Sequence, residues 1–175
     1  MGASTAGQDT PAACGDCVPV MVSRRIGAHA SEIFAVLADP SKHTQIDGSG
    51  MLRGAVTSSV VSGIGDVFVL KMYFSEIGDY EMANVVLEFE TDRRITWQPQ
   101  RNDIDEPSWG QRWGFELTPD GPGATIVTET FDCSRWPEDE RAGIHDGRIW
   151  IEAMSETLQR LDELCTQRSV QPASG

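Results

Sequence analysis

The sequence predicts an α+β domain in which a curved, antiparallel, seven-stranded sheet wraps a long C-terminal helix, with two short helices between the first two strands. Two patterns carry this prediction. Between residues 51 and 133, apolar and polar side chains alternate with a period of two, in runs separated by short turns. After residue 147, apolar residues recur at steps of three and four, which is typical of an amphipathic helix. Because the apolar face of a sheet needs a cover, this helix should pack on it.

The N-terminal part is expected to supply the first strand and the two short helices. Residues 18–26 are rich in Val and Ile, which favours a strand. Residues 30–38 place apolar side chains on one helical face, and Asp39-Pro40 ends that helix. A second short helical turn is predicted at residues 41–46, before the loop sequence DGSG.

The remaining strands should follow one another through short turns. They are expected at residues 51–59, 67–74, 80–90, 94–98, 109–118 and 124–133, with a polar loop at 99–108. Alternation in the strand at 109–118 places Trp109, Gln111 and Trp113 on the face that also holds Phe115 and Leu117. The turn sequence PDGPG after it is a strong hairpin signal.

The long helix is expected at residues 147–166, where it would span about 30 Å. Its apolar positions are Ile151, Met154, Leu158, Leu161 and Cys165. Gly143 and Gly147 weaken the region just before it. The segment between these glycines is therefore predicted to gate a cavity under the helix rather than to cover it.

Composition and charge narrow the class of protein. The chain has 175 residues, of which 39% are hydrophobic, and this suits one globular domain. Its formal net charge of -13 argues against binding to nucleic acid or to an anionic membrane surface. No apolar run approaches the ~20 residues of a membrane span, and the N-terminus lacks the basic start and apolar stretch of a signal peptide. We expect a cytoplasmic monomer or homodimer with a disordered arm at 1–17, one domain at 18–166 and a disordered tail at 167–175.

The sequence offers no pattern for a metal or a cofactor. Cys14 and Cys17 form a lone CxxC pair, and no second pair follows to complete a zinc site. The three histidines include no HxH or HxxxH spacing, and neither GxGxxG nor a Walker sequence is present. We therefore expect no metal and no cofactor.

Three segments carry a family resemblance: SRRIGAHASEIFAVLADPSKHTQIDGSG, NVVLEFETDRRITWQP and ATIVTETFDCSRWP. Together they resemble the START-like (SRPBCC) superfamily, which has the helix-grip fold, and in particular its bacterial polyketide cyclase/dehydrase branch. The resemblance covers about residues 18–166. It implies a ligand-sized cavity between sheet and helix. It does not imply a reaction, because the superfamily has no universal catalytic motif and fold alone does not decide function.

Glu129 is the first candidate catalytic residue. It shares a strand face with Val127 and Phe131, so an inward orientation would bury its carboxyl, raise its pKa and suit it to general acid or base chemistry. Two alternatives are open. The neighbouring threonines face inward instead, or Arg112 on the preceding strand neutralises Glu129. Arg112 is also a candidate catalytic residue.

Two histidines are further candidates. His43 and Asp47 fall near the expected cavity mouth, and a histidine paired with a carboxylate can move protons near neutral pH. The alternative is that His43 caps the short helix and Asp47 only starts a turn. His145 lies between Gly143 and Gly147, where it would meet a ligand or lie exposed in a loop.

The predicted cavity lining is mostly apolar, with a few polar groups that orient a ligand. The candidate ligand-binding residues are Trp109, Gln111, Trp113, Trp150, Phe68, Leu70, Met72, His145 and Asp47. The tryptophans favour an aromatic or polycyclic ligand over an acyl chain, although each of them would equally serve plain core packing.

These observations leave three hypotheses about function. The resemblance implies binding of an apolar, polyketide-like small molecule, with cyclisation or dehydration driven mainly by orientation of the substrate. A carrier or sensor of a hydrophobic metabolite or lipid would need only the apolar lining and a mobile lid. A co-chaperone-type interaction module would instead have a filled cavity and an exposed apolar patch.

Overall fold

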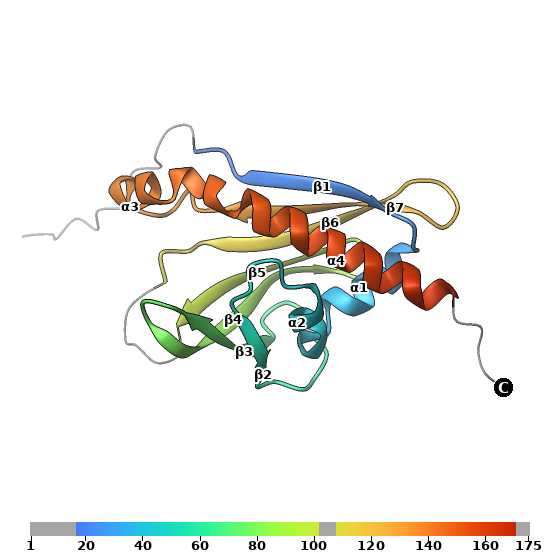
Figure 1. Cartoon of the computed structure of the whole chain (residues 1–175), viewed down its shortest axis with the longest axis horizontal. Coiled ribbons are helices and arrows are strands. Elements are labelled where there is room, and N and C mark those ends of the chain that lie inside the picture. Colours follow the sequence, from blue (N-terminus) through green and yellow to red (C-terminus); the bar gives the residue numbers. More distant parts are fainter. Residues whose placement is uncertain (1–16, 102–107, 171–175) are drawn as a thin grey trace, which may run out of the picture.

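The domain consists of one antiparallel sheet crossed diagonally by one long helix (Figure 1). The computed structural model describes residues 17–101 and 108–170. The elements in chain order are β1 (Val20–Ile26), α1 (Ala30–Leu37), the 3₁₀ turn η1 (Pro40–Lys42), α2 (His43–Ile46), β2 (Leu52–Ala55), β3 (Val67–Phe74), β4 (Gly78–Glu90), β5 (Arg94–Arg101), β6 (Arg112–Pro119), β7 (Thr125–Asp132), α3 (Glu138–Gly143), the 3₁₀ segment η2 (His145–Trp150) and α4 (Ile151–Val170).

The sheet has seven strands in the order β1-β7-β6-β5-β4-β3-β2, and all neighbours are antiparallel. β1 therefore pairs with the last strand, although the other strands follow one another as hairpins. The seven-stranded sheet, the long C-terminal helix and the short helices between β1 and β2 confirm the predicted fold class.

Several strand boundaries differ from the predicted ones. β2 is confined to Leu52–Ala55 and its pairing with β3 is irregular between Leu52 and Gly54. β5 continues to Arg101, into the predicted polar loop. β6 begins only at Arg112, because Gly110 has a φ of 81° and turns the chain just before it.

The long helix is shifted along the chain relative to its predicted range. It begins at Ile151 because Asp146 and Gly147 have φ angles of 51° and 87°, which a helix does not accommodate. It continues to Val170, so the first residues of the predicted tail are helical. The rest of that tail and residues 1–16 of the predicted arm lie outside the described residues.

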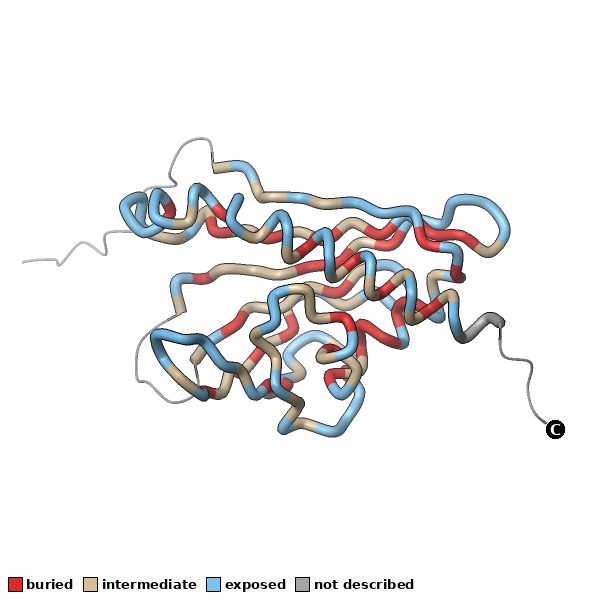
Figure 2. The backbone as a smooth tube through the Cα atoms, viewed as in Figure 1, coloured by how far each residue is buried: buried red, intermediate tan, exposed pale blue. Residues whose placement is uncertain are grey.

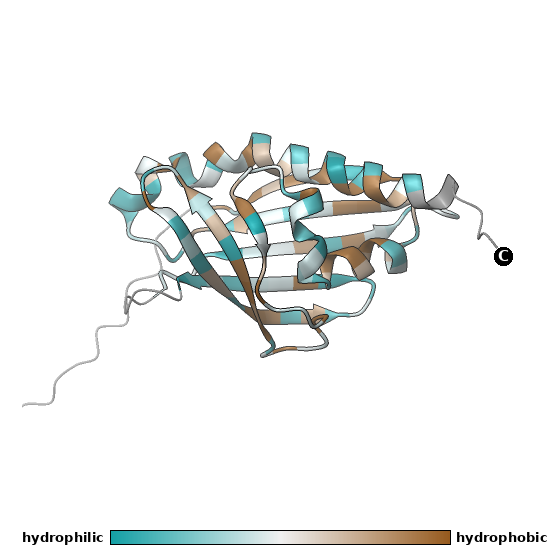
Figure 3. Ribbon diagram, turned by 60° about the horizontal axis from the view of Figure 1, so that its bottom comes forward, coloured by the Kyte–Doolittle hydropathy of each residue, from teal (hydrophilic) through white to brown (hydrophobic). Residues whose placement is uncertain are grey.

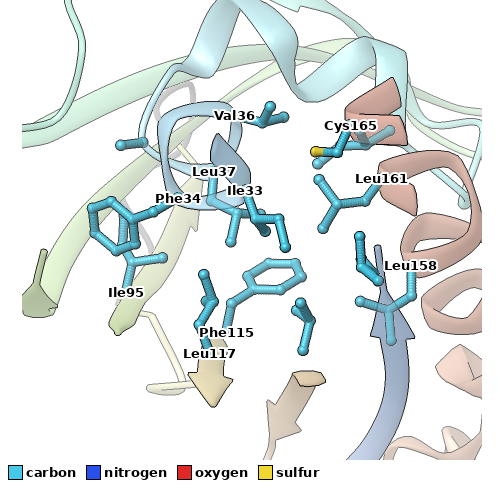
Figure 4. Packing of buried hydrophobic residues seen from close by; sticks show 14 of the residues in the cluster. Ile33, Phe34, Val36, Leu37, Ile95, Phe115, Leu117, Leu158, Leu161 and Cys165 are labelled. Atoms are coloured by element: carbon cyan, nitrogen blue, oxygen red, sulfur yellow. The ribbon is translucent and has the colours of Figure 1, made fainter. Parts of the chain in front are cut away.

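The main hydrophobic core lies at one end of the sheet, between α1 and the C-terminal half of α4. Figure 2 shows buried positions where these helices meet the strands. In Figure 4, Ile33 and Leu37 of α1 point toward Phe115, and Leu158 and Leu161 approach from α4. These side chains are fully or almost fully buried, so truncating one to Ala would cost about 2–5 kcal/mol.

The amphipathic pattern of α4 explains how it sits on the sheet. Figure 3 shows apolar and polar residues alternating along α4 where it lies over the strands. Met154, Leu158, Leu161 and Cys165 are buried as predicted, whereas Ile151 at the start of the helix is exposed. Among the helices that the structure describes, none combines the length and the apolar composition that a membrane span requires.

Candidate functional site

A cavity of about 290 Å³ lies between the sheet, the N-terminal half of α4 and the segment that joins α2 to β2. Its volume is near the lower end of the roughly 300–1,000 Å³ usual for small-molecule sites. The lining is mainly apolar and aromatic, with a few polar groups. It adjoins the packed core, and Phe115 belongs to both.

The inward faces of five strands form the floor of the cavity. Alternation brings Leu70 and Met72 of β3, Trp97 of β5 and Trp113 of β6 to this face. Leu70, Met72 and Trp113 were predicted to bind ligand. Trp97 was missed, because residues 94–98 gave only a short strand with no visible partner for its ring.

The wall opposite the sheet comes from α4 and η2. Trp150 ends η2, and Ala153, Met154 and Thr157 follow along one face of α4. Their spacing of three or four residues places them on adjacent turns. Trp150 was among the predicted ligand-binding residues, and the structure places it in the cavity lining.

The segment from Asp47 to Leu52 closes a third side, and Asp47 organises it. Asp47 Oδ1 accepts hydrogen bonds from the Ser49 amide at 2.9 Å and the Ser49 hydroxyl at 2.6 Å, while Oδ2 accepts from the Leu52 amide at 2.9 Å. Arg160 Nη1 donates to the Asp47 carbonyl at 2.5 Å. The carboxylate of Asp47 therefore fixes the loop, which agrees with the turn alternative rather than with a proton-transfer pair.

Gly48 docks this loop on α4. Its amide donates to Thr157 Oγ1 at 3.1 Å, and a Cβ atom at position 48 would lie 2.1 Å from the Ala153 carbonyl oxygen. Only glycine permits so close an approach of two backbones. The cavity wall is consequently held by backbone contacts rather than by side-chain packing alone.

Glu129 faces into the cavity from β7. Its neighbours on the same face, Val127 and Phe131, are buried, and Glu129 itself is only 4% exposed. Burial raises the pKa of the Glu129 carboxyl well above its usual value, and the nearby charge of Asp47 raises it further. Oε2 of Glu129 is buried without a hydrogen-bond partner among the described residues.

Arg112 lies on the other face of the sheet. It is paired in register with Asp132, whereas the residue opposite Glu129 is Phe115. Since cross-strand partners point to the same face, Arg112 is placed away from Glu129. The alternative in which Arg112 neutralises Glu129 is therefore not found, and Arg112 is not part of the cavity lining.

His43 is buried in the cavity wall, with 5% of its surface exposed. Its Nε2 donates to the Leu37 carbonyl at 2.9 Å, which leaves Nδ1 as the acceptor of a neutral ring. The ring stacks on Trp97 with centroids 5.7 Å apart and meets the edge of Phe68. Burial lowers the pKa of His43 and favours this neutral form. His43 is held by Leu37 and aromatic rings, and the carboxylate oxygens of Asp47 bond to backbone and serine instead.

An aromatic cluster, defined by Trp113, Phe131, Trp136 and Trp150, closes the end of the cavity beneath η2. The ring centroids of Trp113 and Phe131 are 4.6 Å apart, and those of Trp113 and Trp150 are 6.0 Å apart. Trp136 was missed in the sequence because it follows the last strand in an irregular segment. Its Nε1 donates to Gln111 Oε1 at 3.2 Å, so Gln111 lines the cavity while holding Trp136.

Three predicted ligand-binding residues lie outside the lining. Trp109 precedes β6, is 43% exposed and packs edge-on against Trp136 from outside, with centroids 4.8 Å apart. Phe68 is fully buried behind His43. His145 lies exposed in η2 with a φ of 49°, as the loop alternative expects.

Asn84 is a polar lining residue whose orientation depends on an irregularity in β4. An undisturbed strand would place Asn84 and Glu88 on one face. The register of β4 against β5 shifts between Val86 and Glu88, so Asn84 turns inward and is buried while Glu88 is exposed. Asn84 Nδ2 donates to the Met82 carbonyl at 3.1 Å.

The charge of the lining is distinctive. Asp47 and Glu129 contribute carboxyl groups, and within the described ranges no Lys or Arg side chain joins them. In the same part of the chain, no three His, Cys, Asp or Glu side chains converge as metal ligands do. The site can therefore surround an apolar body and offer it a few uncharged polar groups and one raised-pKa carboxyl.

No protein-family profile matches the chain. Two uncharacterised proteins of Mycobacterium tuberculosis, Rv0088 and MT0096, are 33% and 35% identical to it over 119 residues, or 67% of this chain. The chain spans about half the length of these curated relatives, since the match covers 49% of each.

Solved structures share the fold at low sequence identity. Protein NE0264 of Nitrosomonas europaea is 16% identical, with a TM-score of 0.65 over 90% of this chain and 100% of that one. An AHSA1-like protein of Aeromonas hydrophila is 17% identical, with a TM-score of 0.53 over 83% and 94%. The Aha1 dimer of Colwellia psychrerythraea is 18% identical, with a TM-score of 0.55 over 85% and 96%. These likenesses show that the chain shares its fold with these proteins, and they do not single out the polyketide cyclase branch.

Proposed function

We propose that the protein binds an apolar, aromatic small molecule in the cavity between α4 and the sheet. The observation that carries this proposal is the cavity itself. Protein interiors are normally close-packed, with few voids larger than a water molecule. Here α1 and half of α4 pack tightly on the sheet. The other half of α4 instead covers a cavity of about 290 Å³ that is lined by aromatic and aliphatic side chains.

The cavity wall is built in a way that supports binding. The loop at Asp47 is fixed by its own carboxylate and by Gly48 against α4, so the space is held open by backbone contacts. A preformed site of this kind binds without the entropic cost of ordering its walls. A bound apolar molecule would in turn stabilise the fold, because it would supply the contacts that the lining lacks.

A filling substitution tests the proposal. Naphthalene is expected to bind the wild-type protein and to raise its midpoint of thermal unfolding. Ala153→Phe places a ring into the cavity and should abolish that shift, whereas Ala142→Phe on the exposed surface of α3 should preserve it. Equal shifts in both variants would refute binding in this cavity. Native mass spectrometry of the purified protein would then identify any ligand that is retained from the cell.

Catalysis is a second candidate function, and Glu129 is the observation that favours it. A carboxyl with a raised pKa that faces a cavity is suited to give or take a proton during cyclisation or dehydration of a polyketide-like substrate. His43 would orient the substrate rather than transfer its proton, because its Nε2–H is already donated to the Leu37 carbonyl. Glu129→Gln should leave binding intact and stop turnover, and unchanged turnover would exclude Glu129 as the acid or base.

The likeness to an Aha1 protein raises the interaction-module hypothesis again. That hypothesis expects a filled cavity, and the hollow under α4 favours small-molecule binding instead. Formation of a homodimer, as the name of the Colwellia structure describes for that protein, is a proposal for this chain that sedimentation velocity can test.

A further inference from the structure

Among the described residues, the cavity lining offers no positively charged partner for an anionic ligand. In the described part of the chain, its lining includes no Lys or Arg side chain. Burial lowers the pKa of His43 and disfavours its charged form, and its Nε2–H is already donated to the Leu37 carbonyl. The carboxylate of Asp47 adds a negative charge to the wall. A carboxylate or phosphate would have to lose its water without gaining a counter-charge, which is costly.

Within the ranges that the structure describes, two polar atoms of lining residues are buried without a hydrogen-bond partner. They are Oε2 of Glu129 and the indole nitrogen Nε1 of Trp150. Buried polar groups in native proteins almost always have hydrogen-bond partners, so each such exception needs an explanation. A ligand in the cavity provides one explanation for both.

These two groups lie at the same end of the cavity. Glu129 and Phe131 are two residues apart on one face of β7, and the ring centroids of Phe131 and Trp150 are 6.3 Å apart. Both groups therefore border the same aromatic side chain. A polar substituent next to Phe131 would therefore lie beside a side chain that both residues flank.

A cationic substituent fits this end less well. An indole N–H needs an acceptor, and an ammonium group has none. An aromatic cage for a cation also requires a gap between its rings. Here Trp113 lies 4.6 Å from Phe131 and 6.0 Å from Trp150 between ring centroids, so the rings pack against one another.

We propose that the cavity takes an uncharged aromatic molecule that carries one hydroxyl or ketone oxygen, held between the Glu129 carboxyl and the Trp150 indole N–H. This inference rests on the ligand-binding function proposed above and names its ligand class. A hydroxyl accepts from Trp150 and donates to Glu129. A ketone accepts from Trp150 and from Glu129 in its protonated form. The aromatic body occupies the apolar space beside Trp97 and Met72.

A matched set of probes tests this class. Naphthalene, 2-naphthol, 2-naphthoate and 2-naphthylmethylammonium share one ring system and differ in one substituent. At pH 7, 2-naphthol should bind about threefold to tenfold more tightly than naphthalene, which is the gain expected from one or two added hydrogen bonds. The carboxylate and the ammonium should both bind more weakly than naphthalene. Tightest binding by either charged probe would overturn the inference.

Variants at two positions assign the effect to the proposed groups. Trp150→Phe keeps a ring but removes the N–H, so it should reduce the ratio of the naphthalene Kd to the 2-naphthol Kd. This ratio cancels any change in apolar packing that affects both probes. Glu129→Leu removes the carboxyl and should likewise reduce the advantage of 2-naphthol over naphthalene. Glu129→Gln keeps a polar side chain and should retain much of that advantage. Trp109→Phe is the control, because Trp109 lies outside the lining.

A failure of this ligand class can be distinguished from a failure of the proposed binding function. If naphthalene binds in a way that Ala153→Phe blocks, but 2-naphthol binds no better, the ligand class is wrong and cavity binding stands. The same conclusion follows if Trp150→Phe preserves the full advantage of 2-naphthol. If none of the four probes binds, both the ligand class and the proposed binding of aromatic molecules are refuted.

Discussion

Gly48 and Ala153 meet backbone to backbone: a Cβ atom added to Gly48 would lie 2.1 Å from the Ala153 carbonyl oxygen. The contact joins the loop after α2 to the first turns of α4. It lies beside the hydrogen bond from the Gly48 amide to Thr157 Oγ1. Because both segments line the cavity, this contact sets how closely the loop and the helix approach each other there.

Gly48→Ala should destabilise the fold and loosen the cavity. The added methyl group meets backbone atoms that cannot move aside easily, so we expect a loss of about 1–3 kcal/mol in the free energy of unfolding. Urea denaturation monitored by tryptophan fluorescence measures that loss. Naphthalene binding should weaken in parallel.

Gly63→Ala is the matched control for this substitution. No atom lies within 4 Å of a Cβ added at Gly63, and its φ is not positive. Its free energy of unfolding should stay within about 0.5 kcal/mol of wild type. Equal effects of the two substitutions would contradict the importance of the Gly48 contact.

Gly147 is predicted to anchor the segment before α4. It has a φ of 87°, and an added Cβ atom would lie 2.6 Å from Cδ1 of Phe131. Gly147→Ala therefore combines backbone strain with a clash in the aromatic cluster, and we expect a loss of at least ~1 kcal/mol in stability. The near-ultraviolet circular dichroism of the tryptophans should change as well.

Gly143 provides the comparison for Gly147. It ends α3, and no atom lies within 4 Å of a Cβ added there. Gly143→Ala should leave the aromatic signal unchanged. If Gly147→Ala also leaves the circular dichroism of the tryptophans unchanged, η2 is not held in place at Gly147. That result would favour the prediction that this segment gates the cavity.

Much of the fold was predictable because it follows local periodicity. The alternation in β6 correctly placed Trp113 and Leu117 on one face with Phe115, and the alternation in β7 correctly grouped Val127 with Glu129 and Phe131. The three- and four-residue steps of α4 likewise identified Leu158 and Leu161 as core residues. These patterns repeat over many residues, so a single irregularity does not hide them.

The cavity was less predictable because it depends on local irregularities. The register shift in β4 turns Asn84 inward, and the turn at Gly110 removes Trp109 from β6. Trp136 reaches the cavity from a segment without period. The contact of Gly48 with α4 joins residues more than a hundred positions apart, which neither composition nor spacing reveals.

The cysteines should differ in reactivity. Cys17 is half-buried, whereas Cys133 and Cys165 are buried. Burial raises the pKa of the Cys133 thiol to about 11, and its contact with Cys17 contributes to the rise. In a Cys14→Ser background at pH 8, iodoacetamide should label Cys17 at least tenfold faster than Cys133, because a thiol of such high pKa holds little thiolate there.

Peptide mass spectrometry after timed labelling measures this order. In urea all three cysteines should react at similar rates, which controls for differences in the peptides. Faster labelling of Cys133 than of Cys17 in the folded protein would contradict the buried position of Cys133.

The stability of the protein should carry a pH signature of Glu129. The pKa of its carboxyl is raised in the folded state, so the unfolded chain loses this proton at lower pH than the folded chain does. Between the two pKa values the folded state binds more protons, and the free energy of unfolding falls as pH rises. Below the unfolded pKa of ~4.3, Glu129 is protonated in both states and this loss of stability is absent.

Glu129→Gln removes that titration and keeps the size of the side chain. The stability of the variant relative to wild type should therefore increase with pH above about pH 4, by up to ~1.4 kcal/mol for each pH unit between the two pKa values. Urea denaturation of both proteins from pH 4 to pH 8 measures the difference, in which the other titrating groups cancel. A flat difference for Glu129→Gln would mean that Glu129 ionises in the folded protein as easily as in water, and it would remove the support for Glu129 as a buried acid.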